Sequence, residues 1–474
     1  MHKKKLLIVL FAMLGVFTAK AQSGYRIEVK VNQATADELY LAYHFGKQQY
    51  IADTAKAIGS GKYVFEGDKK LEGGLYLVAL PPANKFFEIL IDKERSQQFG
   101  IATDTASYGV DPKIAGSPMN KAFYEYVSYL SDKKAEGQSL QKLMQDPNTS
   151  DGDMGKYEEQ LQSLSQQVKD YQNKVVEGYK GTILSSMLLA NQSVKMPDPP
   201  AGAGKNYQLY YYRDHYFDNI DWSDESLLRT PILDTKITDY LDRLYPKVAD
   251  SLIVGVDSVL SMAYAGGSED MKKFVTSKLL NEYAKSKLMG MDAVYVHIAE
   301  NYYGKGKTPW VEEEQLKKIL DNAKRLSSIL IGKKAPNLAL PKLDGQKTTL
   351  HSVDAKYTVV YFWDPDCGNC SKASDKLVAM YDEYKAKGVE IFGICNKTYE
   401  ELGKCVKKEE EKGMKWINTA DPYGRGQAHA KYYVRANPLI FLLDKDKIIR
   451  YKRIDPDQLK DILDRELEAN QEQN

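Results

Sequence analysis

The chain is 474 residues long, which is enough for about three domains that each bury a sizeable hydrophobic core. Its 66 lysines and arginines nearly balance its 65 aspartates and glutamates, and the net charge of +1 argues against a nucleic-acid-binding protein. Four cysteines in so long a chain also exclude a scaffold that is held together mainly by disulfide bonds.

The first 21 residues have the parts of a secretory signal peptide. A basic start precedes the apolar run 6–17, which is too short to span a bilayer comfortably, and Ala19-Lys20-Ala21 fits a cleavage site. We therefore predict a signal peptide at 1–21, cleavage after Ala21 and export to the periplasm or cell envelope. The alternative is an N-terminal membrane anchor, but no second apolar stretch supports one. We expect no integral membrane span after signal removal.

Residues 22–116 are predicted to form a β-rich domain. Ile27, Val29 and Val31 alternate with charged residues, which is the period of a strand with one buried face. Short strands at close spacing favour an antiparallel sandwich or a small barrel. This part of the chain contains no catalytic constellation. The further strands are expected at 39–43, 63–66, 75–80 and 86–91, with glycine-containing turns between some of them.

Residues 117–331 show helical periodicity. Ser117 followed by Pro118 is a plausible helix start, and the polar-rich stretch 154–176 is a candidate for a long helix. The proline- and glycine-rich stretch 196–204 is expected to be a loop. We therefore predict an α-helical middle region.

Residues 332–474 alternate strands and helices. The apolar run 358–363 predicts a buried strand, which 364–366 ends because proline fixes φ and lacks a backbone donor. A helix should follow up to Gly388, and then a second apolar strand at 389–395. These two strands should be parallel, because a helix connects them.

The rest of this region is predicted to complete a mixed sheet that helices cover on both faces. We expect a charged helix, a short extended segment, a hairpin and a last helix, at 398–411, 416–421, 439–444 with 448–454, and 456–468.

Cys367 and Cys370 lie where the first of these strands is followed by a helix. At a helix N-terminus, unpaired N–H groups and the helix dipole favour an anion, here the thiolate of Cys367. Such a thiolate can attack a disulfide, and Cys370, about one helical turn further on, can resolve the mixed disulfide. Half of a zinc site is the alternative, but Cys395 and Cys405 are ten residues apart and do not form a matching ligand pair. We expect no metal and no cofactor.

Together these features resemble the TlpA/ResA-like group of thioredoxin-fold proteins, which borders the AhpC/TSA peroxiredoxins in sequence. The resemblance covers about 333–474 and implies a thioredoxin-like α/β domain. In that family the last matching segment holds a cis-proline that faces the disulfide, so the resemblance implies this role for Pro438. The matching segments are 332–338 (GKKAPNL), 343–350 (LDGQKTTL), 362–370 (FWDPDCGNC) and 437–444 (NPLIFLLD).

Two features depart from neighbouring families. The position six before Cys367, which is a buried acid in thioredoxin itself, is Tyr361 here. Peroxiredoxins carry a Pro-x-x-x-Thr/Ser-x-x-Cys pattern, and Val360 and Asp364 occupy its proline and hydroxyl positions. A peroxidatic role is therefore not expected.

The first two thirds of the chain resemble the regions that precede thioredoxin domains in secreted proteins of Bacteroidetes-type bacteria. The β domain of those proteins is generally taken as a binding or docking module. We thus expect a multidomain protein with an all-β sandwich-like domain (22–116), an α-helical middle region (117–331) and an α/β thioredoxin-like domain (332–474).

Cys395 and Cys405 are open to three interpretations. Cys395 lies at the carboxyl end of its strand, on the same edge of the parallel pair as Cys367, and Cys405 falls in the next helix. The two can pair as a structural disulfide, relay electrons from the active site, or remain buried thiols. An oxidising compartment favours pairing.

The sequence as a whole predicts a periplasmic thiol:disulfide oxidoreductase with Cys367 as nucleophile and Cys370 as resolving thiol. Trp363 is expected to form a packing wall. Negative charge on Asp364 and Asp366 should oppose the thiolate, which favours a reducing direction because strong oxidants stabilise their reduced thiolate. The expected partners are a protein disulfide substrate and an upstream thiol donor. The alternative is a periplasmic binding or docking protein whose thioredoxin domain is redox-inert or structural.

Overall fold

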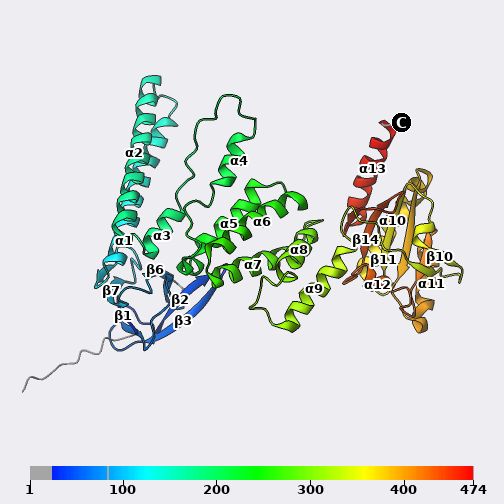
Figure 1. Cartoon of the computed structure of the whole chain (residues 1–474), viewed down its shortest axis with the longest axis horizontal. Coiled ribbons are helices and arrows are strands. Elements are labelled where there is room, and N and C mark those ends of the chain that lie inside the picture. The colour runs from blue at the N-terminus through cyan, green and yellow to red at the C-terminus, as the bar shows by residue number, and fades with distance from the viewer. Residues whose placement is uncertain (1–23, 83–84, 473–474) are drawn as a thin grey trace, which may run out of the picture. The chain divides into compact units, whose positions relative to one another are not determined.

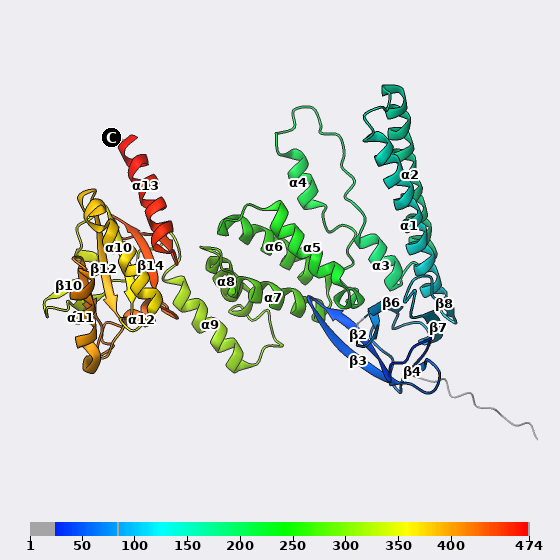
Figure 2. The same cartoon turned by 180° about the vertical axis from the view of Figure 1, so that it is seen from behind.

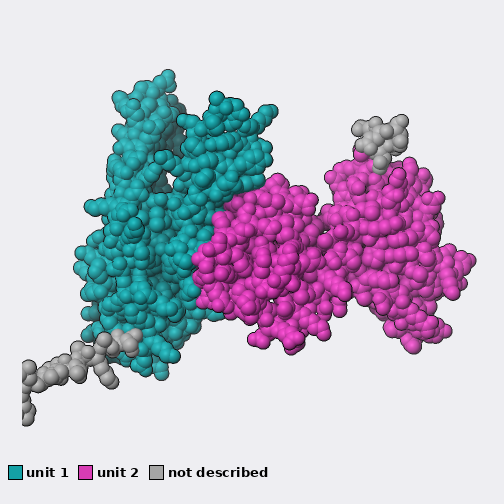
Figure 3. All heavy atoms as spheres, viewed as in Figure 1, with its two compact units in different colours: residues 1–238 teal, residues 239–474 magenta. Residues whose placement is uncertain are grey.

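The computed structural model describes residues 24–82 and 85–472. The predicted signal peptide and its cleavage site lie outside the described residues. The chain forms two compact units, one up to residue 238 and one from residue 239 (Figure 3). Within the described ranges, no helix combines the length and the apolar character that crossing a bilayer requires.

The first unit begins with two four-stranded sheets (Figure 1). One sheet has the order β4-β1-β7-β8, and the other has the order β3-β2-β5-β6. The strands are β1 (Tyr25–Asn32), β2 (Glu38–Phe45), β3 (Gln48–Lys56), β4 (Lys62–Gly67), β5 (Gly74–Leu80), β6 (Lys85–Ile91), β7 (Gln98–Asp104) and β8 (Lys113–Ala115).

The two sheets share one apolar core. Ile27 and Val29 of β1 are buried in it with Leu41 of β2 and Ile89 of β6, as the alternating pattern of β1 predicts. The expected all-β sandwich-like domain is confirmed. The expectation of a purely antiparallel sandwich is wrong, because β1 and β7 pair in parallel, with Ile27 opposite Phe99. The chain passes through the second sheet between these two strands, so no tight hairpin joins them.

Helices follow in the first unit. Ser117 caps α1, since its side chain accepts a hydrogen bond from the backbone N of Asn120, and Pro118 is the first helical residue. Helices α1 and α2 run side by side (Figures 1 and 2). The elements are α1 (Pro118–Met144), α2 (Asp151–Gly178), α3 (Ile183–Ala190), α4 (Tyr207–Asp214), the 3-10 helix Glu225–Arg229 and α5 (Pro231–Leu244), which continues beyond residue 238 into the second unit.

The second unit begins with more helices, which confirms the helical middle region. Buried apolar side chains line the contact faces of these helices, for example Val256 of α6, Leu279 of α7 and Val294 of α8. The elements are α6 (Ala249–Gly266), α7 (Glu269–Ala284), α8 (Asp292–Ile298), a π-helical turn (Ala299–Tyr303) and α9 (Glu313–Ser327).

A five-stranded sheet with the order β13-β12-β11-β14-β15 follows. Its first three strands are parallel, whereas β14 and β15 are antiparallel to their neighbours. Every residue of β11 and β12 is buried, as expected for central strands that are covered on both faces. The strands are β11 (Tyr357–Trp363), β12 (Val389–Cys395), β13 (Ile417–Ala420), β14 (Leu439–Asp444) and β15 (Ile449–Lys452).

Helices cover both faces of this sheet (Figure 2). On one face, Leu377 of α10 and Leu459 of α13 share a core with Val359 of β11. On the other face, the ring of Tyr432, just after α12, lies 5.3 Å from that of Phe362. The thioredoxin-like α/β domain is confirmed. The helices are α10 (Gly368–Ala386), α11 (Leu402–Lys412), α12 (Ala428–Lys431) and α13 (Pro456–Glu472), with short 3-10 turns at Leu350–Ser352 and Tyr399–Glu401.

Other backbone segments pair with both edges of the sheet. Beside β15, Gly332 donates to the carbonyl of Ile449 at 2.8 Å, and Ile449 donates to that of Lys333 at 2.9 Å. Strands β9 (Ala339–Pro341) and β10 (Lys347–Thr349) form a hairpin beside β13. Lys342 of this hairpin pairs with Thr419 of β13 through an isolated backbone bridge.

A buried ion pair ties the sheet to the helices of the same unit. The side chain of Lys452 on β15 is 1% exposed and that of Asp292 on α8 is 8% exposed, and Lys452 Nζ donates to the Asp292 carboxylate. Lys452 Nζ also donates to the carbonyl of Ile329 at 2.7 Å. Because both charges are out of water, each depends on the other for compensation.

Candidate active site

Cys367 is the residue immediately before α10. Its backbone is extended, and its Sγ accepts a hydrogen bond from the backbone N of Cys370 at 3.3 Å, so the sulfur caps the helix. Both cysteines are free thiols, and Cys367 is partly exposed whereas Cys370 is 1% exposed. An accessible sulfur at a helix N-terminus, with a second one buried behind it, provides an attacking and a resolving thiol.

The buried thiol has an altered acidity. Burial raises the pKa of Cys370 to about 12, and its hydrogen bond with Cys367 acts in the same direction. Cys370 is therefore protonated at neutral pH, and it must lose its proton before it can act as a nucleophile.

Pro438 lies beside Cys367. The Asn437–Pro438 peptide bond is cis, and the carbonyl oxygen of Asn437 lies 3.7 Å from Cys367 Sγ. Pro438 also lines a cleft of about 660 Å³. Arg435, Arg453, Asp455 and Gln458 contribute polar groups to this cleft, and Ala284 and Ile329 line it from the helical part of the same unit.

The acidic residues before Cys367 are paired with lysines. Lys397 Nζ lies 3.0 Å from Asp364 Oδ1 and 2.9 Å from Asp366 Oδ2, and Lys404 Nζ lies 2.9 Å from Asp366 Oδ2. The hydrogen bonds from Lys397 and then Lys404 hold the pKa of Asp366 below its ordinary value. The structure thus adds lysine partners that the sequence analysis did not include, and the expected opposition of these carboxylates to the Cys367 thiolate stays a prediction. The pairing of β11 with β12 brings the lysines to this edge from a later part of the chain.

Cys395 and Cys405 form a disulfide bond with a Cα–Cα distance of 6.2 Å. Of the three interpretations, the structure thus contains the pair, and these cysteines are not the second ligand pair of a zinc site. Both residues are buried, at 1% and 0% exposure. Cys395 lies opposite Trp363 in the parallel pair of β11 and β12. Trp363 is itself fully buried in the core under the site.

Tyr361, which occupies the position of the buried acid of thioredoxin, lies under Cys370. Its hydroxyl donates to the carbonyl of Cys370 at 3.1 Å or pairs with Ser374 Oγ at 3.0 Å. Burial raises the pKa of Tyr361, so it is a neutral hydrogen-bonding group. The contact with Ser374 was not expected, although Ser374 lies one helical turn after Cys370 and therefore on the same helix face.

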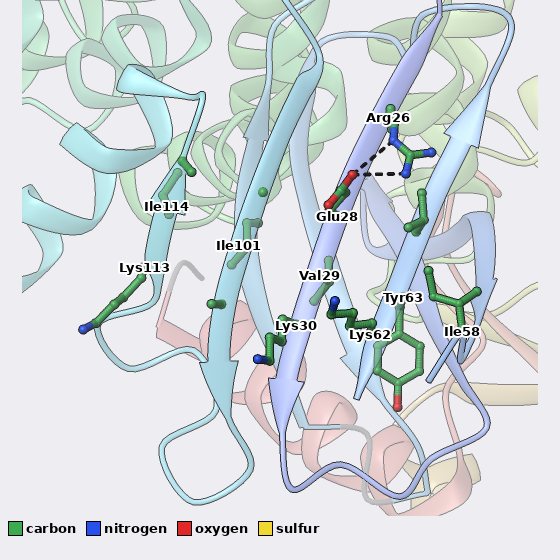
Figure 4. A pocket seen from close by; sticks show the side chains of 14 residues that line it. Arg26, Glu28, Val29, Lys30, Ile58, Lys62, Tyr63, Ile101, Lys113 and Ile114 are labelled. Atoms are coloured by element: carbon green, nitrogen blue, oxygen red, sulfur yellow. Dashed lines mark hydrogen bonds and ion pairs between the residues drawn. The ribbon is translucent and has the colours of Figure 1, made fainter. Parts of the chain in front are cut away.

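A second cleft, of about 470 Å³, lies on the outer face of the sheet that contains β1 (Figure 4). Its lining includes Lys30, Lys62 and Lys113, and Arg26 forms an ion pair with Glu28 there. No cysteine or histidine is among the residues that line it, so this cleft offers no thiol chemistry.

Three parts of the chain match known protein families. Residues 331–452 match the AhpC/TSA family. Residues 25–123 match the domain of unknown function DUF4369, and residues 155–327 match the domain of unknown function DUF5106.

Relatives of the C-terminal part are thiol-disulfide oxidoreductases named ResA. The one from Bacillus cereus is 32% identical over 124 residues, which are 24% of this chain and 65% of that protein. The one from Bacillus thuringiensis subsp. konkukian is 33% identical over 122 residues, which are 25% of this chain and 68% of that protein. The chain thus spans just under two thirds of the length of the first of these relatives.

Solved structures that are similar to this chain include two from other bacteria. A domain of a possible thiol-disulfide isomerase from Cytophaga hutchinsonii is 32% identical and covers 30% of this chain and 96% of its own, with a TM-score of 0.28. A thioredoxin-like protein from Bacteroides caccae is 20% identical and covers 58% of this chain and 98% of its own, with a TM-score of 0.46.

Proposed function

This chain belongs, through its C-terminal domain, to the ResA-like thiol-disulfide oxidoreductases of the AhpC/TSA family, and from this premise we propose that it exchanges disulfide bonds with exported proteins. The observation that carries the proposal is the unequal placement of the two thiols. Cys367 is accessible at the start of α10, and Cys370 is buried one turn behind it.

In the reducing direction, the thiolate of Cys367 attacks one sulfur of a substrate disulfide. A mixed disulfide forms, and the other substrate sulfur leaves as a thiolate that takes up a proton. Cys370 then loses its proton and attacks Cys367 Sγ, which releases the second substrate thiol and closes the Cys367–Cys370 disulfide. A dithiol donor from outside the chain returns this disulfide to the two thiols by the reverse exchange.

The substrate chain is proposed to lie against Pro438. The support for this placement is the carbonyl of Asn437, which is 3.7 Å from Cys367 Sγ, and the cleft that continues from Pro438. A polypeptide in this cleft would meet Arg435 and Arg453 as well as the helical part of the unit. That arrangement allows a folded or partly folded protein to be recognised beyond its disulfide bond.

The reducing direction is supported by Cys370 rather than by the acidic residues. Its raised pKa keeps it a thiol in the reduced protein, so this residue adds no stabilised thiolate of the kind that makes a strong oxidant.

The proposed location is the periplasm or cell envelope, with cleavage after Ala21, on the evidence of the N-terminal sequence pattern. Mass spectrometry of the N-terminal peptide of protein from the cell envelope tests this proposal. A peptide that starts at Gln22 supports export, and a peptide that starts at Met1 contradicts it.

Turnover of the full-length mature chain tests the proposed activity. Reduction of insulin by dithiothreitol should be faster with the wild-type protein than without it, and a Cys367→Ser/Cys370→Ser variant should give only the uncatalysed rate. Equal rates with the folded wild type and this variant would favour the alternative, a binding protein whose thioredoxin domain is redox-inert.

A further inference from the structure

The loop before Cys367 is tied to the segment that follows β12. Lys397 bridges Asp364 and Asp366, and Lys404 reaches Asp366 from the start of α11. The side chain of Lys397 is only 11% exposed, so its two ion pairs are less screened than an ordinary surface pair. This arrangement differs from the exposed i,i+4 pairs elsewhere on the helices, which contribute little.

Both lysines lie within the segment that the second disulfide closes. Cys395 is the last residue of β12 and Cys405 lies in α11, with a sequence separation of 10. The bond fixes the start of α11 against the end of the strand. The backbone N of Asn396 also donates to the carbonyl of Trp363 at 2.8 Å, which holds the segment on β11, the strand that leads to the nucleophile.

The titratable groups around Cys367 come from three elements. The loop before it contributes Asp364 and Asp366, and the segment after β12 contributes Lys397, Lys404 and Glu401, whose Oε1 lies 2.7 Å from Lys404 Nζ. From α10 the buried Cys370 faces Cys367 as a neutral thiol. Without the lysines, two carboxylates would stand near a developing thiolate with no compensating charge.

We propose that Lys397 and Lys404 are positioning residues that stabilise the reduced, thiolate form of the Cys367–Cys370 pair by neutralising Asp364 and Asp366. The Cys395–Cys405 disulfide holds both lysines in place. Since its sulfurs are buried, it acts as a fixed brace beside the active site and not as an electron relay. The inference rests on the proposed function, because it concerns the same dithiol.

The double variant Lys397→Gln/Lys404→Gln tests the role of the lysines. Equilibration of full-length protein with reduced and oxidised glutathione should show an equilibrium shift of about tenfold towards the disulfide form, which corresponds to about 30 mV more reducing. The pH at which iodoacetamide labels Cys367 at half its maximal rate should rise. Lys397→Arg should keep both values. Lys407→Gln is the matched control, because Lys407 lies on α11 but pairs with Glu411 and is 78% exposed.

A Cys395→Ala/Cys405→Ala variant tests the brace. It should shift the glutathione equilibrium in the same direction as the double lysine variant. An unchanged equilibrium in the folded cysteine variant would overturn the role of the disulfide. If that variant does not fold, limited proteolysis of the wild type decides instead. Cleavage within 396–404 that appears only after reduction supports the brace, and an unchanged cleavage pattern overturns it. Wild-type values in the folded double lysine variant would overturn the whole inference.

These outcomes are separate from failure of the proposed function. The equilibrium with glutathione needs only the two thiols and no protein substrate. A wild-type protein that fails to accelerate insulin reduction contradicts the proposed function, whereas its glutathione equilibrium still decides whether the lysines act on the dithiol.

Discussion

The sulfur of Cys367 lies 3.7 Å from the carbonyl oxygen of Asn437, although the two residues are 70 positions apart in the chain. The pairing of β11 with β14 brings them together, because the end of β11 meets the start of β14, with Phe362 opposite Leu439. Cys367 is thus partly exposed beside Pro438, while Cys370 is enclosed by the core.

The first prediction concerns the order in which the two thiols react. A limiting dose of iodoacetamide on the reduced protein should label Cys367 before Cys370, because Cys370 is 1% exposed. Cys367→Ser should abolish exchange, and Cys370→Ser should accumulate mixed disulfides that mass spectrometry detects. Preferential labelling of Cys370 in folded protein, or turnover by Cys367→Ser, would reverse the assignment.

The second prediction concerns pH. Because the pKa of Cys370 is raised to about 12, the fraction that is ionised at neutral pH is small and grows with pH. The decay of a preformed mixed disulfide on Cys367 should therefore accelerate by about tenfold per pH unit between pH 7 and pH 9, where only the thiolate attacks. Stopped-flow measurement with a chromogenic mixed disulfide gives this rate. A flat profile would mean that a nearby base deprotonates Cys370.

The same shift predicts a change in stability. The pKa of Cys370 in the folded protein is raised from 9.0. Its contribution to the free energy of unfolding is therefore fully present below pH 9 and is lost as pH rises towards 12. Urea unfolding of the reduced wild type should weaken over this range relative to Cys370→Ser, which has no thiol to ionise. Free energies of unfolding that change with pH in the same way in both proteins would contradict the raised pKa of Cys370.

The third prediction concerns Tyr361. Tyr361→Phe removes the hydroxyl that contacts the carbonyl of Cys370 and Ser374 Oγ, and it should lower the free energy of unfolding by about 1–2 kcal/mol. Because the ring stays in place, the helix start should hold its position and insulin reduction should change little. The control is Tyr399→Phe, whose ring is exposed. A large loss of turnover without loss of stability would assign Tyr361 to the chemistry itself.

The fourth prediction concerns the buried ion pair. Lys452→Met leaves the carboxylate of Asp292 without compensation and should lower the free energy of unfolding by about 3–5 kcal/mol. Adding Asp292→Leu should restore most of that loss, as a double-mutant cycle would measure. The matched control is Lys318→Met, which breaks the exposed pair with Glu314 and should cost below about 1 kcal/mol. Additive losses at Lys452 and Asp292 would show that the two do not depend on each other.

The sequence predicted the elements of the C-terminal domain because each carries a strong local signal. The apolar run at 389–395 is β12 without any change of bounds, and Cys367 directly precedes the helix that its spacing indicated. By contrast, β3 was not expected, because most of its side chains are exposed and give no alternation. The parallel pairing of β1 and β7 depends on contacts far apart in the chain, which a local pattern does not contain.

The site was predicted in the same uneven way. Cys367, Cys370 and Pro438 belong to short motifs and were found from them. Lys397 and Lys404 were not found, because each is an ordinary lysine in a charged stretch and gains its partners only when β12 pairs with β11. The signal that could have found Lys397 is its position two residues after the carboxyl end of a central parallel strand, at the same edge as Cys367.

The covered edges of the five-stranded sheet have a consequence for contact with unfolded chains. An enzyme that acts on reduced or incorrectly disulfide-bonded proteins is often close to unfolded chains. An unpaired edge strand could bind such a chain as an additional strand and so promote aggregation. Here residues 332–335 pair with β15, and the segment after β9 pairs with β13. If the proposed function holds, an unfolded substrate can therefore bind and leave without adding a strand to this sheet.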